Sequence, residues 1–239
     1  MDASGILRAL RHRNFRLFIS GQAISLIGTW MQRIAMGWLV YRLTGSVFLL
    51  GLVGFVGQIP TFLLAPFAGV IADRHDRYRI VIVTQVLAML QAFILAFLVL
   101  TGAIEVWHII VLGLVLGIIN AQDVPARQSF FIEMVENKDD LGNAIALNSS
   151  IVNAGRLIGP SLAGILIALV GEGVCFLING ISYIAVIVAL FAMTIKPRKI
   201  EKKNGRILTD IREGFSYVFH FAPIRSILLL LSLVSLVGM

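Results

Sequence analysis

Long apolar runs separated by short polar turns make up most of this chain. Each run is about twenty residues long, enough for a helix to cross a hydrocarbon core of ~30 Å. We expect six spans and the beginning of a seventh: Phe15–Tyr41, Val47–Ala72, Ile80–Thr101, Val106–Val124, Ala144–Val170, Val174–Ile195 and Ile224–Met239. The pattern therefore predicts an all-α membrane protein.

The composition agrees with this pattern. The chain is 58% hydrophobic and only 14% charged, whereas soluble domains contain about 25% charged residues. Its single cysteine, Cys175, excludes an internal disulfide and is expected to be a small core residue. The first apolar run is too long for the apolar part of a signal peptide, so we interpret it as a retained span.

Basic residues are concentrated on alternate connections between the predicted spans. The turns at 42–46, 102–105 and 171–173 contain one basic residue, Arg42, and apart from Arg33 and Arg156 every other Lys and Arg lies on the opposite side. The positive-inside rule then predicts a cytoplasmic N-terminus, in the inner membrane of a bacterium. This topology accounts for the net charge of +7, so we expect no nucleic-acid partner.

Three parts follow from this division. Residues 1–195 form six spans, residues 196–222 a basic cytoplasmic linker, and residues 223–239 the start of span seven. Apolar residues in Arg206–Phe221 recur at helical spacing, which predicts an interfacial amphipathic helix, with a disordered linker as the alternative. Because the last span stops at Met239 after ~16 residues, we expect a fragment whose C-terminal half is missing.

The second and fifth spans are rich in glycine and proline. Small residues allow helices to approach closely in lipid, and proline bends a helix by removing a backbone donor. Both spans carry a small-residue–Pro pattern that ends in Ala-Gly, at Ala65–Gly69 and Gly159–Gly164. Because each is the second span of its triplet, the pattern suggests a three-plus-three inverted repeat.

A charged turn separates the second and third spans. It contains Gly69, Asp73, Arg74 and Arg77, and at these positions it resembles the loop between spans two and three of the major facilitator superfamily. Two neighbouring positions depart from that pattern: Asp76 replaces the usual glycine, and Tyr78 a basic residue.

The fifth span strengthens the resemblance. The run Gly155-Arg-Leu-Ile-Gly159-Pro160-Ser-Leu-Ala-Gly164 resembles the antiporter motif of that superfamily, with an alanine in place of one glycine. Together with Trp38–Ser46, it makes the chain similar to the drug and siderophore exporter branch, which includes enterobactin-exporter-like proteins. The resemblance covers Phe15 to Met239 and implies the N-terminal half of a twelve-span transporter.

The resemblance also implies roles for the two motifs. The charged turn would form a latch on the outward-open state, and Asp123, ~17 residues into span four, is expected to pair with Arg74 or Arg77. Solvated charges that only fix topology are the alternative. Gly155, Gly159, Pro160 and Gly164 would pack against a span of the missing half, with generic helix packing as the alternative.

Three charged residues are predicted at membrane depth: Arg33, Asp123 and Arg156. Arg156 lies near the midplane, whereas Arg33 lies nearer the outer face, where snorkelling is favoured. A fixed cation suits an anionic substrate group or requires a carboxylate partner. Uncharged cavity candidates, each also able to form an interhelical hydrogen bond, are Gln22, Gln32, Asn120, Asn148 and Asn153.

These residues favour transport over catalysis. The four histidines lack metal-ligand spacing, and no nucleophile–base set or phosphate loop is evident, so we expect no enzyme, metal or cofactor. We expect a secondary, proton-coupled exporter of a small amphipathic or anionic molecule, such as a drug or siderophore. The alternative is a transporter-like membrane protein that acts as a sensor or assembly partner.

Overall fold

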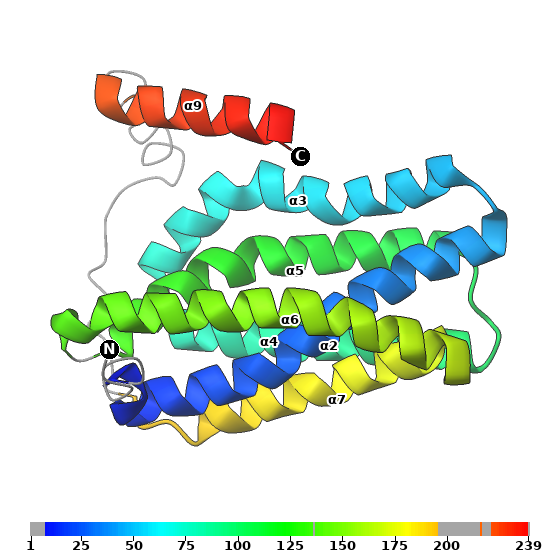
Figure 1. The fold of residues 1–239 in the computed structure, drawn as a ribbon, viewed down its shortest axis with the longest axis horizontal. Coiled ribbons are helices and arrows are strands. Elements are labelled where there is room, and N and C mark those ends of the chain that lie inside the picture. Colours follow the sequence, from blue (N-terminus) through cyan, green and yellow to red (C-terminus); the bar gives the residue numbers. More distant parts are fainter. Residues whose placement is uncertain (1–7, 136, 196–215, 217–220, 239) are drawn as a thin grey trace.

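The computed structural model describes residues 8–135, 137–195, 216 and 221–238, and these residues form helices joined by short turns (Figure 1). The helices are η1 (Arg8–Arg11), α2 (Arg13–Thr44), α3 (Val47–Arg74), α4 (Arg77–Leu100), α5 (Val106–Glu133), η2 (Lys138–Asp140), α6 (Leu141–Val170), α7 (Glu172–Phe191) and α9 (Ala222–Gly238). The expected amphipathic helix at 206–221 lies outside the described residues, apart from Ser216 and Phe221.

The prediction of an all-helical bundle with six long helices is confirmed. Five of them, α3 to α7, are long and apolar enough to cross a membrane. The remaining helix, α2, spans 32 residues, or about 48 Å, and is more polar. The seventh helix, α9, coincides with the predicted start of span seven, and its described leucines are exposed.

The contacts between helices repeat from the first three helices to the second three. In one set α2 packs on α6 and α7, and in the other α5 packs on α3 and α4; α4 and α7 join the two sets. Let α2, α3 and α4 correspond to α5, α6 and α7 in that order. The contact of α2 with α6 then corresponds to that of α5 with α3, and the contact of α2 with α7 to that of α5 with α4. This is the arrangement that a three-plus-three repeat predicts.

Glycines allow the helices to approach closely at both repeated contacts. A Cβ added to Gly159 of α6 would lie 2.6 Å from the Cβ of Trp30 and 2.8 Å from the carbonyl oxygen of Ile27, both in α2. A Cβ added to Gly117 of α5 would lie 2.6 Å from the carbonyl oxygen of Gly57 in α3. Backbone meets backbone here, as small residues permit in lipid.

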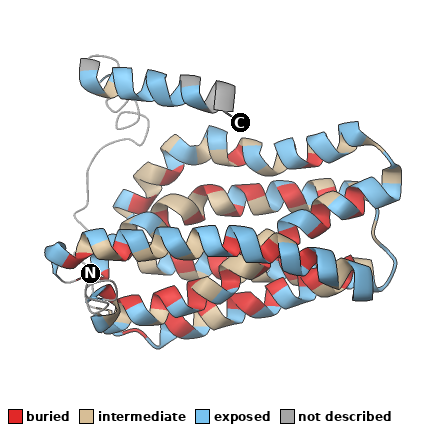
Figure 2. Cartoon of the chain, viewed as in Figure 1, coloured by how far each residue is buried: buried red, intermediate tan, exposed pale blue. Residues whose placement is uncertain are grey.

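The bundle buries its helices unequally (Figure 2). Only 11% of the most apolar stretch of α3 and 17% of that of α6 are buried, against 39% to 44% in α4, α5 and α7. Large apolar side chains remain exposed on both helices, among them Phe62 of α3 and Leu157 of α6. Each of the two helices therefore has one packed face and one uncovered face within the described residues.

One predicted boundary is wrong by about two and a half turns. We expected span four to end at Val124, before Pro125, yet α5 continues to Glu133 with that proline inside it. The added turns are held by aromatic packing, because Phe130 and Phe131 meet Phe18 and Phe15 of α2 edge to face. Tertiary packing therefore outweighs the loss of one backbone hydrogen bond.

The close contact of α2 and α6 yields a stability prediction. Gly159→Ala places a methyl group against backbone and should lower the free energy of unfolding by about 1–3 kcal/mol, read as a lower melting temperature of the detergent-solubilised protein. The control is Gly142→Ala in the same helix, where an added Cβ meets nothing within 4 Å. Equal melting temperatures for the two variants would contradict the packing described here.

Candidate functional site

The charged turn between α3 and α4 is fixed by one arginine. Arg77 donates to Asp73 at 2.7 Å, to Glu133 at the end of α5 at 2.7 Å, and to the carbonyl oxygen of Ala72 at 3.2 Å. The Arg77 side chain is largely covered, whereas its two carboxylate partners are more exposed. The turn is thereby fastened to α5, at the end of the bundle that we call the loop-motif end.

Both departures from the superfamily pattern have a structural explanation. Asp76 is the N-cap of α4, and its side chain accepts a hydrogen bond from the backbone N–H of Tyr78 at 3.0 Å. The Tyr78 hydroxyl donates to the carbonyl oxygen of Leu190 near the end of α7 at 3.2 Å. Each replacement therefore contributes a hydrogen bond that organises this end of the bundle.

The expected pairing of Asp123 with Arg74 or Arg77 is wrong. Asp123 pairs with Arg127, one turn further along α5, at 3.0 Å, while Glu133 takes the place beside Arg77. The error follows from the boundary of span four: because α5 continues to Glu133, Asp123 lies inside the helix, about 15 Å of helix rise before that residue.

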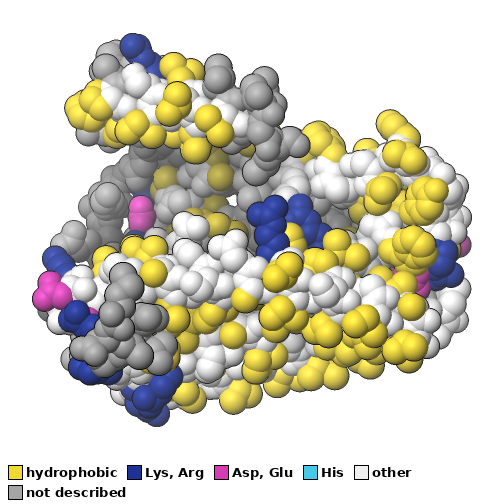
Figure 3. Space-filling model, in the orientation of Figure 1, with side chains coloured by type: hydrophobic (Ala, Val, Ile, Leu, Met, Phe, Trp, Pro, Cys, Tyr) yellow, Lys and Arg dark blue, Asp and Glu magenta, His cyan; other side chains and the backbone are white. Residues whose placement is uncertain are grey.

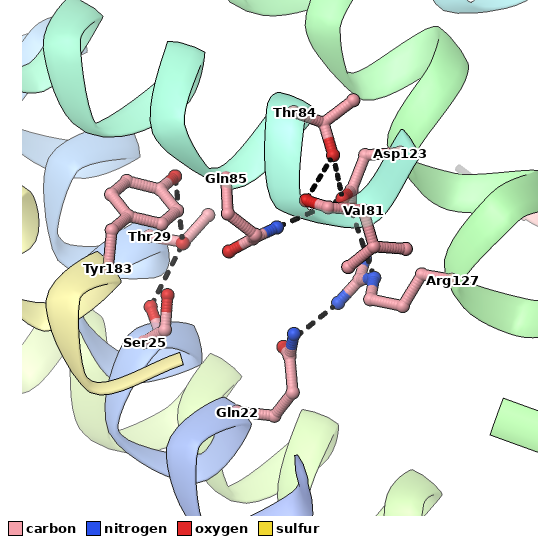
Figure 4. Close-up of polar contacts among 9 residues, drawn as sticks. All are labelled: Gln22, Ser25, Thr29, Val81, Thr84, Gln85, Asp123, Arg127 and Tyr183. Atoms are coloured by element: carbon pink, nitrogen blue, oxygen red, sulfur yellow. Dashed lines mark hydrogen bonds and ion pairs between the residues drawn. The ribbon is translucent and has the colours of Figure 1, made fainter. Parts of the chain in front are cut away.

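Asp123 and Arg127 form the centre of a buried polar network (Figure 4). One carboxylate oxygen of Asp123 accepts from the Thr84 hydroxyl at 2.8 Å and from the Gln85 amide at 2.9 Å, both in α4. Arg127 also donates to the Oε1 atom of Gln22 in α2 at 3.1 Å. The network joins α2, α4 and α5, and Asp123 is only 5% exposed.

A second buried network consists of amides. Gln32 donates to the Oε1 atom of Gln91 in α4 at 3.0 Å and accepts from Asn179 of α7 at 2.7 Å. Gln91 in turn donates to the carbonyl oxygen of Leu112 in α5 at 3.3 Å. Gln32, predicted as a cavity residue, borders a cavity between α2, α3 and α5, but its amide already forms hydrogen bonds to α4 and α7.

A cavity of about 700 Å³ opens between α2, α3 and α5. Polar groups at its wall come from Thr29, Gln32, Arg33, Gln58 and Asn120, and apolar residues and glycines make up most of the rest. The Asn120 side chain makes no hydrogen bond within the described residues. Of the predicted cavity residues, Arg33, Gln32 and Asn120 therefore line this space.

Arg33 and Arg156 meet at a tryptophan that the sequence analysis did not single out. Their guanidinium carbons lie 5.3 Å and 5.6 Å from the centroid of the Trp30 ring. Both arginines are exposed, and basic side chains gather in the hollow at mid-length of the molecule (Figure 3). Arg156 does not line the cavity itself, but Trp30 connects it to Arg33, which does.

The other predicted site residues lie elsewhere. Gln22 is buried in the Asp123 network, with its Nε2 atom unbonded among the described residues, and Asn153 donates to the carbonyl oxygen of Ser149 within α6. An added Cβ at Gly69 or Gly164 meets nothing within 4 Å.

The predicted antiporter-type glycines separate into two groups. Gly155 and Gly159 pack on α2 of the same bundle, so the implied packing of these two residues against the missing half is wrong. These two glycines face the interior of the bundle, where their lack of a side chain lets α6 approach the backbone of α2. Pro160 is half-buried beside them, and Gly164 borders a second, smaller pocket near Arg42.

Sequence reasoning missed Arg127, Glu133 and Trp30. The i, i+4 spacing of Asp123 and Arg127 was an available signal for a helical ion pair, but Arg127 was assigned to a loop. Arg33 follows Trp30 by three residues in α2, which was an available signal for a contact between them. Nothing in the local sequence points to the contact of Trp30 with Arg156, which lies in α6.

The helices, their apolar faces and the buried polar groups define a multi-pass integral membrane protein. The sequence pattern of the family described as transmembrane secretion effector matches residues 4–237. The chain belongs to this family of the major facilitator superfamily, whose members are membrane transporters rather than enzymes.

Several curated proteins are similar to this chain. The Staphyloferrin A transporter of Staphylococcus aureus is 29% identical over 194 residues, covering 81% of this chain and 49% of that protein. Macrolide efflux protein A of Streptococcus pyogenes is 23% identical, over 90% of this chain and 57% of that protein. Multidrug efflux pump Tap of Mycolicibacterium fortuitum is 21% identical, over 84% of this chain and 51% of that protein. The chain thus spans about half the length of these relatives.

The Asp123–Arg127 pair yields a second stability prediction. Arg127→Gln leaves a buried carboxylate without its cation and should lower the free energy of unfolding by roughly 3 kcal/mol. Adding Asp123→Asn should recover part of that loss, because the uncompensated charge is then removed. The melting temperatures of the two single variants and the double variant measure this coupling, and strictly additive losses would contradict a direct interaction.

Proposed function

We propose that this chain is the N-terminal half of a secondary active exporter that moves a small amphipathic or anionic molecule out of the cell, driven by protons. The observation that carries the proposal is the cavity of about 700 Å³ that lies among α2, α3 and α5 and is bordered by Arg33. Its size suits a small molecule. The relatives named as a Staphyloferrin A transporter, a macrolide efflux protein and a multidrug efflux pump support a small-molecule substrate.

The domain arrangement is part of the proposal. Residues 1–195 form the six-span half, residues 196–222 the linker, and residues 223–239 the start of the next half. The uncovered faces of α3 and α6 would meet that second half, with the cavity between the two. This is supported by the low burial of both helices and by the length of the relatives.

The orientation follows from charge. With the loop-motif end in the cytoplasm of a bacterial inner membrane, most basic residues lie on the cytoplasmic side. Arg42, the basic residue of the opposite turns, is neutralised there by Glu172, which accepts from it at 2.7 Å and 3.2 Å. The outer end of the bundle therefore carries little unpaired positive charge.

Asp123 is the residue we propose for proton coupling. It is a nearly inaccessible carboxylate in the interior of a spanning helix, a position where ionisable groups usually have functional roles. A proton placed on its carboxylate would end the charge attraction to Arg127 and change the hydrogen bonds from Thr84 and Gln85. Because these bonds join α4 and α5, protonation would act on the packing of two helices.

The Arg77 cluster would set how the loop-motif end moves. Arg77 ties the turn after α3 to the end of α5, so the position of α3, whose other face is uncovered, depends on these ion pairs. Ion pairs whose carboxylates are exposed to this extent are individually weak. They are therefore suited to being broken and remade as the two halves of a transporter rock.

Export is tested in cells that express the full-length protein, by mass spectrometry of small molecules in the medium. We expect at least one compound to appear with the wild type, and to disappear when a protonophore collapses the proton gradient. Asp73→Asn should lower its export at normal protein level, because Arg77 loses a charged partner, while insertion depends on the apolar spans and basic flanks.

The matched control is Asp139→Asn, an exposed carboxylate at the same end of the bundle whose loss should leave export unchanged. Unchanged export in Asp73→Asn would mean that the charged turn only fixes the topology of the chain in the membrane. If the medium contains the same small molecules whether or not the cells express the protein, a role other than transport is favoured.

A further inference from the structure

Two cations share one aromatic ring in the middle of this bundle. The guanidinium carbons of Arg33 and Arg156 lie 5.3 Å and 5.6 Å from the Trp30 centroid, close enough for each to interact with the face or edge of the indole. Since both distances are measured from one point, the two carbons are no more than about 11 Å apart. Neither arginine forms an ion pair within the described residues.

Their position makes this arrangement unfavourable without a counter-charge. Arg156 lies in the middle of the 30-residue α6, and Arg33 lies about three turns before the end of the 32-residue α2. Arginine keeps its charge in such places, and charged groups at membrane depth face a partner or a water-filled cavity. Two like charges at this separation also repel each other.

The surroundings leave access to both cations. Both side chains are exposed, and Arg33 lines the cavity together with the uncommitted amide of Asn120. Trp30 packs beside Gly159, whose missing side chain brings α6 to within backbone contact of α2. The glycine contact therefore fixes the spacing of the two arginines, which come from different helices.

We propose that Arg33, Trp30 and Arg156 form a binding site for an anion with two separate negative groups, such as a dicarboxylate. Each guanidinium would take one anionic group through its forked donors, and the body of the ligand would lie against the indole. A cationic compound would be repelled by both arginines. This inference rests on the proposed function, because the bound dianion would be the exported substrate.

Binding is tested with two probes of equal length, the dicarboxylate adipate and the monocarboxylate hexanoate. Titration calorimetry on the purified full-length protein should show adipate binding roughly tenfold more tightly, because a second charge-assisted contact is available. Arg33→Gln and Arg156→Gln should each bring adipate to the affinity of hexanoate. Arg156→Lys should retain part of the preference, since it keeps the charge but not the fork.

The matched control is Arg79→Gln, which removes an arginine that is 85% exposed at the loop-motif end and should leave the preference for adipate unchanged. Melting temperatures of the same variants identify the competing explanation. If carboxylates elsewhere in the full-length protein neutralise these arginines, Arg33→Gln and Arg156→Gln will lower stability and the wild type will bind adipate and hexanoate equally. That result would overturn the proposal.

The export experiment separates this site from the proposed function. A preference for adipate that depends on both arginines, in a protein that exports nothing, would support the site and reject the exporter. Gradient-dependent export by a protein that binds adipate and hexanoate equally would support the exporter and reject the site.

Discussion

A polar group inside a bilayer has to find its partner within the protein, and this requirement organises the centre of the bundle. Asp123, Arg127, Thr84, Gln85 and Gln22 are joined by hydrogen bonds and an ion pair across three helices. The amides of Gln32, Gln91 and Asn179 form a second network, which brings in α7. These contacts are directional, whereas apolar packing in lipid provides little preference between neighbouring helices. The networks therefore specify which helices are neighbours.

The two outer helices are attached by a different interaction. α6 is held on α2 by Gly155 and Gly159, and α3 is held on α5 by Gly117 and Pro60. Close backbone approach along one face leaves the other face of each helix uncovered. The same contact brings Arg156 to Trp30, so the geometry of the proposed anion site and the attachment of α6 have one cause.

The sequence predicted those features that depend on local pattern. Apolar length defined the spans, and repeated small residues suggested the relation between the two triplets that the helix contacts support. The failures concern tertiary contacts. Span four was expected to end at Val124, and only the packing of Phe130 and Phe131 on α2 shows why α5 continues past that residue. Because this boundary was placed too early, Asp123 was expected beside Arg77, and Glu133, which pairs with Arg77, was not recognised.

The site could be predicted in its members but not in its arrangement. Arg33 and Arg156 were evident as charges in apolar runs, because such charges are unusual. Their shared ring was not, since the sequence does not show which helices cross at Trp30. The inward direction of Gly155 and Gly159 was likewise hidden, because a glycine strip does not identify its neighbour.

We propose that the uncovered faces of α3 and α6 meet a second half of the protein. Oxygen accessibility of spin labels in the reconstituted full-length protein tests it most directly, with labels at Phe62→Cys and Leu157→Cys and references at Phe97→Cys of α4 and Val188→Cys of α7. All four native side chains are exposed in the bundle. We predict low oxygen accessibility at the first two positions and the high accessibility of lipid-facing sites at the references. Equal, high accessibility at all four positions would contradict the account.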